Sequence, residues 1–248
     1  MIMKQLVVYI FFLSIVSACK KPEERTCLKR TGEIDTVELT VASFDKLFLH
    51  EHIEFELIQD SLDKVVLIGG KNLLGEIQLS VIEGQLDISN HNRCNFLRDY
   101  QKKVKAEIHF TSIINIHFEG TETLLNRDTL QFEWLTFLIR DGAGPVKLNF
   151  NAQSVNAIVS HGWGDFTFKG KVNQANLNVR SNGFCDTYGM KVLDSLTVIS
   201  NTQGTVKVNA NGAKLKAQTE ADGNILYKGI PLSIQFNQIG AGSLIDSN

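Results

Sequence analysis

Three aspartates and one histidine are the residues whose type and spacing could support catalysis. Asp141 and Asp165 fall near equivalent turns of a repeating pattern, Asp186 lies close to the next turn, and His161 lies in the same region. Cleavage of a glycosidic bond needs clustered carboxylates with a base on one face. Aspartates at turns, however, commonly bond their own backbone. We therefore expect no catalytic residue and no enzyme activity.

Two histidines are the best candidates for metal ligands. His50 and His52 alternate with apolar residues, which predicts that both lie on one face of a strand. Two imidazoles can bind a metal, but no third ligand can be placed beside them, and an exposed, solvated pair is the favoured interpretation. The Gly-Gly-x-Gly-x-Asp repeat of calcium-binding β-rolls is absent from the sequence. We expect no metal and no cofactor.

Trp163 is the one candidate for a ligand contact. It lies beside the turn glycine Gly164, where an exposed indole could stack on a sugar ring. Phe166 and Phe168 alternate with polar residues, so we expect both in the core.

The cysteines give no disulfide pattern. Apart from Cys19, the chain contains Cys27, Cys94 and Cys185. Three cysteines cannot all pair within one chain, and their spacing fixes no pairing. We expect reduced, buried thiols.

The elements that must position these residues follow a period of about 20 residues. The last glycines of successive turn signals are separated by 20, 19, 21, 19 and 19 residues. These glycines are Gly144, Gly164, Gly183, Gly204, Gly223 and Gly242. Alternating apolar and polar residues between them indicate strands. The pattern predicts a β-solenoid whose coils pair in parallel, about 4.8 Å apart.

An antiparallel sandwich or barrel is the alternative fold, with strands recurring about every 8 to 12 residues. The strong signal here recurs at about twice that interval, with weaker breaks near Ala152-Gln153 and Val172-Asn173. The solenoid is therefore favoured. We expect pairs such as Asp141-Gly142 and Asn182-Gly183 to supply the positive φ that turns require.

Residues Ile34 to Phe118 form short alternating strands that repeat less cleanly. We expect first coils or a capping sheet here, because an open solenoid end exposes unpaired strand edges.

Residues 1–18 have the features of an export signal. Lys4 precedes an apolar stretch of 11 residues, Leu6 to Val16. The segment that ends in Cys19 resembles the lipobox of a bacterial lipoprotein signal peptide. That resemblance implies that Cys19 becomes the first residue and carries acyl chains, such as palmitate, which anchor the protein to a membrane. An ordinary secretory signal is the alternative.

Residues 19–32 are charged, contain Pro22 and lack apolar periodicity, which predicts a flexible tether. Charged residues after the cysteine also resemble, loosely, the surface-export signals of Bacteroidetes lipoproteins. A solvated linker is the favoured interpretation.

Composition narrows the class of protein. The chain is 43% hydrophobic and 21% charged, with 25 basic and 27 acidic residues and a formal net charge of −2. This balance gives no support to nucleic-acid binding. No segment after the leader is apolar enough to cross a membrane.

Several segments resemble the family described as putative auto-transporter adhesin, head GIN domain, found in Bacteroidetes. They are Ser43-Phe44, Val81 to Ile88, the recurring glycine turns, and Asp222 to Pro231. The resemblance implies a right-handed parallel β-helix similar to pectin-cleaving enzymes, although the Asn-Thr-Asp, Asp-Asp, Gly-His-Gly and Arg-Ile-Lys motifs of polygalacturonases are absent. Turns that lack one expected glycine, as at Gly183, put the regularity of those coils in doubt.

We therefore expect a GIN-type β-helix domain over residues 33–248, held by a lipid at the bacterial outer membrane, either periplasmic or surface-exposed. The expected function is non-catalytic and adhesin-like, presenting a binding surface to a glycan or a surface protein. The alternative is a carbohydrate-active or carbohydrate-binding β-helix protein acting on envelope or host glycans. The sequence does not define the ligand, the leaflet or the oligomeric state.

Overall fold

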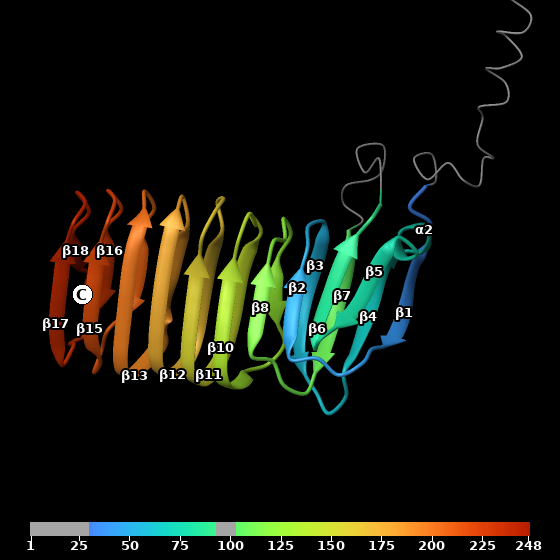
Figure 1. Ribbon diagram of the computed structural model, residues 1–248, viewed down its shortest axis with the longest axis horizontal. Coiled ribbons are helices and arrows are strands. Elements are labelled where there is room, and N and C mark those ends of the chain that lie inside the picture. Colours follow the sequence, from blue (N-terminus) through green and yellow to red (C-terminus); the bar gives the residue numbers. More distant parts are fainter. Residues whose placement is uncertain (1–29, 93–102) are drawn as a thin grey trace, which may run out of the picture.

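The chain folds into a β-solenoid of about seven turns with about 20 residues per turn (Figure 1). The structure is a computed structural model that describes residues 30–92 and 103–248. Strands dominate these residues, and the helix among them is the four-residue α2 (Lys71–Leu74). The predicted solenoid is confirmed, and the alternative of an antiparallel sandwich is wrong.

The strands of the first half are β1 (Ile34–Thr40), β2 (Lys46–Leu49), β3 (Ile53–Gln59), β4 (Lys64–Gly70), β5 (Ile77–Ile82), β6 (Gln85–Asn90), β7 (Val104–Phe110), β8 (Asn115–Phe118) and β9 (Leu124–Asn126). Those of the second half are β10 (Leu130–Ile139), β11 (Pro145–Val159), β12 (Asp165–Ser181), β13 (Phe184–Thr202), β14 (Val206–Asn209), β15 (Lys214–Thr219), β16 (Ile225–Lys228), β17 (Ser233–Gln238) and β18 (Leu244–Asp246).

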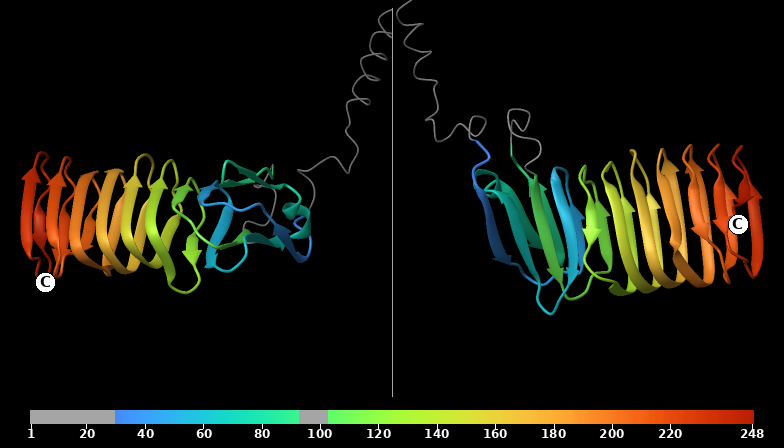
Figure 2. Two further views of the ribbon diagram at one scale, coloured as in Figure 1. Left: turned by 60° about the horizontal axis from the view of Figure 1, so that its bottom comes forward. Right: turned by 180° about the vertical axis from the view of Figure 1, so that it is seen from behind.

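Successive coils pair in parallel with an offset of one repeat. In β11 and β12, for example, Val146 pairs with Phe166 and Val159 with Val179. The pairing is interrupted at Gln153, where the sequence predicts a weaker break. Because β11, β12 and β13 each continue through such a break, one long strand contributes to both faces of the coil (Figure 2).

The solenoid has two faces, each a parallel sheet, and two edges, where the chain passes from one face to the other. The first face contains β3, β9, β14, β16, β18 and the starts of β11 to β13, whereas the second face contains β2, β8, β15, β17 and the ends of β11 to β13. The strands bend along one edge, which we call the bend edge, at the bottom of Figure 1. The glycine turns form the opposite edge, which we call the turn edge.

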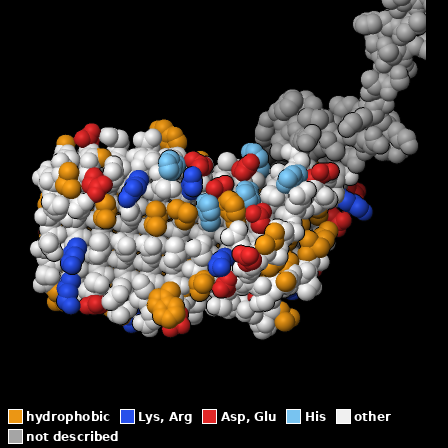
Figure 3. Space-filling model, in the orientation of Figure 1, with side chains coloured by type: hydrophobic (Ala, Val, Ile, Leu, Met, Phe, Trp, Pro, Cys, Tyr) orange, Lys and Arg blue, Asp and Glu red, His pale blue; other side chains and the backbone are white. Residues whose placement is uncertain are grey.

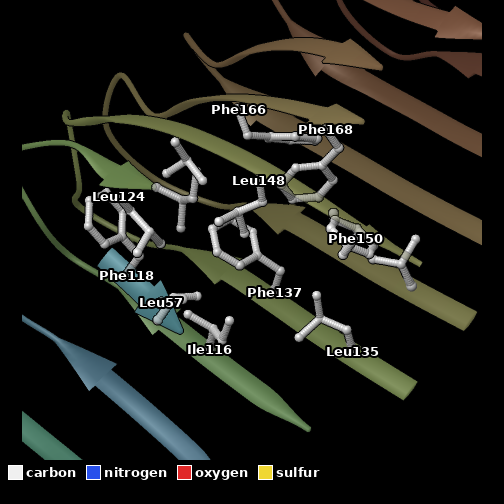
Figure 4. Close-up of a cluster of buried hydrophobic side chains, with 14 of the residues drawn as sticks. Leu57, Ile116, Phe118, Leu124, Leu135, Phe137, Leu148, Phe150, Phe166 and Phe168 are labelled. Carbon is white, nitrogen blue, oxygen red and sulfur yellow. The ribbon is translucent and has the colours of Figure 1, made fainter. Parts of the chain in front are cut away.

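The core is a stack of inward-facing apolar side chains between the two faces (Figure 4). Phe168 is fully buried, with ring centroids 5.4 Å from Phe137, 5.1 Å from Phe150 and 4.5 Å from Phe166. Most of these rings meet edge to face or tilted, the geometry that aromatic quadrupoles favour. The prediction that Phe166 and Phe168 lie in the core is confirmed.

The turn glycines stack on one another because successive turns approach closely. A Cβ added at Gly144 would lie 1.9 Å from the carbonyl oxygen of Glu122, and one at Gly223 would lie 2.2 Å from that of Gly204. The expectation that the pair Asp141-Gly142 supplies positive φ is confirmed at Asp141, whereas the same expectation for the pair Asn182-Gly183 is wrong. In the second turn, positive φ falls on Ser181, the residue before Asn182. Glycine is needed here for room rather than for backbone freedom.

The N-terminal end is closed by strands that break the parallel pattern. β1 pairs antiparallel with β4, β4 with β7, and β5 with β6. The helix α2 adds Leu73 and Leu74 to the core at this end. Behind the cap, β2 and β3 already pair in parallel with β8 and β9. The first half of the chain therefore supplies both a cap and the first coils.

Candidate functional site

The first candidate site lies on the turn edge, beside the residue that the sequence singles out. Trp163 is 68% exposed. Trp163 lies in the turn just before Asp165, and Asn182 lies in the corresponding turn of the next coil, just before Phe184, with which Asp165 pairs. Asn182 lines a groove of about 430 Å³. This turn-edge groove is formed by Ser160, Arg180, Ser181, Asn182, Asn201, Thr202, Gln203 and Ala221.

The turn-edge groove is rich in hydrogen-bonding side chains. Arg180 donates through Nε to Asn178 at 3.0 Å, and Asn201 donates to Glu220 at 2.9 Å. The remaining N–H groups of the guanidinium, together with the amides of Asn182 and Gln203, can donate or accept toward a ligand. An exposed indole beside amide and guanidinium groups can bind a polar ring by stacking and hydrogen bonding.

The second candidate site lies on the bend edge, where sequence analysis placed none. A groove of about 400 Å³ follows the interrupted pairing at Gln153 and Asn173. Trp134 pairs with Ser154 at this edge and is 58% exposed. The bend-edge groove is formed by Gln131, Phe132, Asn151, Ala152, Gln153, Lys171, Val172, Asn173 and Leu193.

The bend-edge groove combines an apolar floor with amides and one cation. Phe132 is 8% exposed, whereas Leu193 is 41% exposed. Asn151 accepts a hydrogen bond from the Lys171 backbone at 3.0 Å, which orders the amide. Lys171 pairs in register with Lys191 on the next coil, and neither ammonium makes an ion pair within residues 30–92 and 103–248. Adjacent like charges repel, so this part of the edge favours an anionic group.

The predicted histidine pair is arranged differently from expectation. β2 ends at Leu49 and β3 begins at Ile53, so His50 and His52 lie in the bend between two strands, not on one strand face. His50 is half-buried, with Nε2 3.2 Å from Asp87 Oδ2, and is therefore not a solvated side chain. His52 is exposed, as expected, and has a φ of 64°. In the part of the chain that the structure describes, no group of three or more His, Cys, Asp or Glu residues could hold a metal ion.

A second histidine on this face, His117, packs against an aromatic ring. Its ring stacks on Phe48 with centroids 4.4 Å apart, and Nε2 lies 3.1 Å from Glu119 without forming a hydrogen bond. Burial lowers the pKa of His117 below 6.5. Phe48, His117, Leu138 and Ile158 occupy paired positions and make a mainly apolar row across the second face (Figure 3).

Carboxylates on the first face are held in an ion-pair network. Glu56 and Glu107 are neighbours in register, and Lys105 and Arg127 bridge them at 2.7 to 3.1 Å. Burial raises the pKa of Glu56, but hydrogen bonds from Arg127 and Lys105 outweigh it and lower the pKa overall. A carboxyl with a lowered pKa is a poor general acid near neutral pH.

The three aspartates considered for catalysis do not occupy paired positions. Asp165 pairs with Phe184, and Asp186 pairs with Thr167. Asp186 lies within β13 and accepts a hydrogen bond from the Tyr188 backbone at 3.0 Å, whereas Asp141 has a positive φ, as expected of a turn-forming residue. Burial raises the pKa of Asp165.

Cys185 is buried, free and in register with Phe166, and burial raises the pKa of its thiol well above the usual value. This agrees with the expected reduced, buried thiol. Cys19, Cys27 and Cys94 lie outside the described residues. No helix among the described residues has the length and apolar character needed to span a membrane.

The sequence profile of the family described as putative auto-transporter adhesin, head GIN domain, matches residues 43–231. The chain belongs to this family. A comparison with curated proteins finds no match. Membership of the GIN family indicates an adhesin-like protein of the cell surface or envelope.

Solved structures share the fold of this GIN domain. A putative adhesin from Bacteroides fragilis NCTC 9343 superposes with a TM-score of 0.77 at 21% identity, covering 87% of this chain and 97% of that one. A putative adhesin from Parabacteroides distasonis ATCC 8503 gives 0.64 at 19% identity, covering 87% and 98%. A putative lipid binding protein from the same strain gives 0.62 at 19% identity, covering 88% and 98%.

Proposed function

We propose that the chain is a non-catalytic adhesin-like protein of the cell envelope, anchored by a lipid on Cys19, which binds a partner through the turn edge of its solenoid. Family membership supports the envelope location. The observation that carries the binding role is the exposed Trp163 beside the turn-edge groove. Tryptophan is enriched among the few side chains that dominate the binding energy of protein interfaces.

The test is adhesion of cells that display the chain to host or bacterial surfaces, compared with cells that display Trp163→Ala. Ile82→Ala is a matched control, because Ile82 is also 68% exposed but lies on the capping strand β5. We expect at least a tenfold loss of adhesion for Trp163→Ala, as for an interface anchor worth about 2 kcal/mol, and no loss for Ile82→Ala. Equal adhesion by the Trp163 variant would reject the turn edge as the binding surface.

A second function, carbohydrate binding, is favoured by the bend-edge groove. Amides, a lysine and an apolar floor together suit the hydroxyl groups, carboxylates and ring faces of an acidic sugar. A glycan array is the direct test. We expect acidic glycans to be retained, and Trp134→Ala and Lys171→Gln each to weaken that retention. If both variants still bind acidic glycans as strongly as the unchanged chain, the bend-edge groove is not the glycan-binding site.

The anchor is tested in cells. Incorporation of a palmitate analogue and recovery in the membrane fraction are both expected for the unchanged chain and lost in Cys19→Ala. Protease treatment of intact cells then separates surface exposure from a periplasmic location. A Cys19→Ala chain that still incorporates the acyl label would contradict the anchor.

A further inference from the structure

The two ends of the solenoid are finished differently. Antiparallel strands and α2 cover the N-terminal end. At the other end, β17 pairs with β15 and β18 with β16, and no described residue covers their outer edges (Figures 1 and 2). Repeat proteins normally carry a polar terminal repeat, since the last repeat has no neighbour to bury its inner face.

The last coil exposes apolar side chains at positions that are buried in the preceding coil. Ile234 pairs with Leu215, and Phe236 pairs with Ala217. Leu215 and Ala217 are 1% and 4% exposed, whereas Ile234 is 46% and Phe236 is 36% exposed. The row of inward-facing apolar side chains therefore continues into β17, where it is exposed to solvent. Further apolar side chains exposed near this end are Ile230, Leu232, Ile239 and Ile245.

The end also lacks the usual protections of a strand edge. Exposed edges are commonly blocked by charged residues, by proline or by a bulge. The segment from residue 229 to 245 contains no Asp, Glu, Lys or Arg, and β17 itself contains no proline. Every residue of β17 is exposed, so half of its backbone N–H and C=O groups face outward without a strand partner.

We propose that this end binds the same end of a second copy of the chain, giving a closed tail-to-tail dimer. Because β17 carries no charged residue, two identical copies meet across β17 without like-charge repulsion, and the charged residue of β18, Asp246, lies at the last position of that strand. The strands of the two faces run in opposite directions, so a two-fold axis across the end pairs β17 antiparallel with β17 or with β18 of the other copy. Antiparallel pairing satisfies the outward backbone groups of both edges.

The capped N-terminal end favours a dimer over a filament. An open-ended filament would need head-to-tail contact between β17 and the N-terminal end. The antiparallel strands β1 and β5, rather than a continuing parallel coil, form the edges there. A tail-to-tail contact is isologous and closes after two copies.

The size of the end predicts the strength of the dimer. Strands about 20 Å long on two faces about 10 Å apart outline an end of roughly 200 Å² in cross-section per copy. That is below the typical value of about 800 Å² per partner, so we expect a dissociation constant on the order of micromolar.

The test is the mass of the full chain, purified from its producing cells in mild detergent, by light scattering after gel filtration between about 1 and 100 µM, a range that spans the expected constant. Phe236→Lys and Ile230→Lys place a charge in the proposed contact, and both side chains are exposed, so folding is retained. Leu193→Lys is the control, because Leu193 is 41% exposed but lies at the bend edge.

We expect the protein mass of the unchanged chain and of Leu193→Lys to rise toward twice that of the monomer with concentration, and both end variants to weaken association at least tenfold. A chain that stays monomeric throughout the range overturns the proposal. So does association that survives both end substitutions, or growth into species larger than a dimer.

Discussion

Removing one ring from the phenylalanine stack should cost this solenoid a large part of its stability. Phe168 is fully buried and contacts the rings of Phe137, Phe150 and Phe166. Truncation of a buried phenylalanine to alanine costs about 3 to 5 kcal/mol, from lost transfer free energy and the cavity that remains. The total free energy of unfolding of a folded domain is about 5 to 15 kcal/mol, so Phe168→Ala should be severely destabilised.

Urea unfolding followed by circular dichroism measures the effect. With a slope of about 3 kcal/mol/M, a loss of about 4 kcal/mol moves the midpoint down by about 1.3 M. Phe184→Ala is the control, because Phe184 is 50% exposed and its truncation should cost less than about 1 kcal/mol. A Phe168→Ala midpoint within about 0.3 M of the unchanged chain would show that this stack is not the stabilising centre we describe.

Four further substitutions test other parts of the fold by the same unfolding assay. Gly144→Ala should cost more than about 2 kcal/mol, because its Cβ would collide with backbone, whereas Gly75→Ala should be neutral or stabilise by up to about 1 kcal/mol, since nothing lies within 4 Å of that Cβ. Thr202→Val should cost about 1 to 3 kcal/mol, because the buried hydroxyl donates to a carbonyl at 2.8 Å and accepts from the Gly204 amide at 2.9 Å; an unchanged midpoint would deny these bonds any role. Burial lowers the pKa of His117 below 6.5, so the unfolded chain binds its proton more readily. The stabilisation of the folded state by neutral His117 is fully present above about pH 6.5 and is lost as the pH falls through the pKa of the folded state. His117→Gln should therefore reduce the difference in urea midpoint between pH 8 and pH 5.

The coils could be predicted from the sequence because local chemistry defines them. Turn glycines and strand alternation recur once per coil, and each coil only needs to pair with its neighbours. The cap could not be predicted in the same way. Whether β4 runs parallel or antiparallel to β7 is decided by long-range packing, which no local pattern records. The bend after Leu49 likewise separates His50 from the strand that alternation suggested.

The two candidate grooves could be predicted only in part from the sequence. Trp163 attracts notice because a glycine turn adjoins it, but Trp134 lies within an apolar stretch and resembles core. The bend-edge groove joins residues of neighbouring coils, so it exists only once the register is known. Writing the sequence in rows of 20 would have aligned Gln131, Asn151 and Lys171, which are indeed register partners.

Because successive coils are related by a nearly constant number of residues, the length of the solenoid can change by whole coils. Because β11 to β13 repeat one another at nearly constant offset, gain or loss of one coil between them leaves the capped end and the apolar end unchanged. Each coil would move the two ends apart by only about 4.8 Å. Duplication of about 20 residues could therefore lengthen or shorten the reach of the molecule in small steps, without redesigning either end.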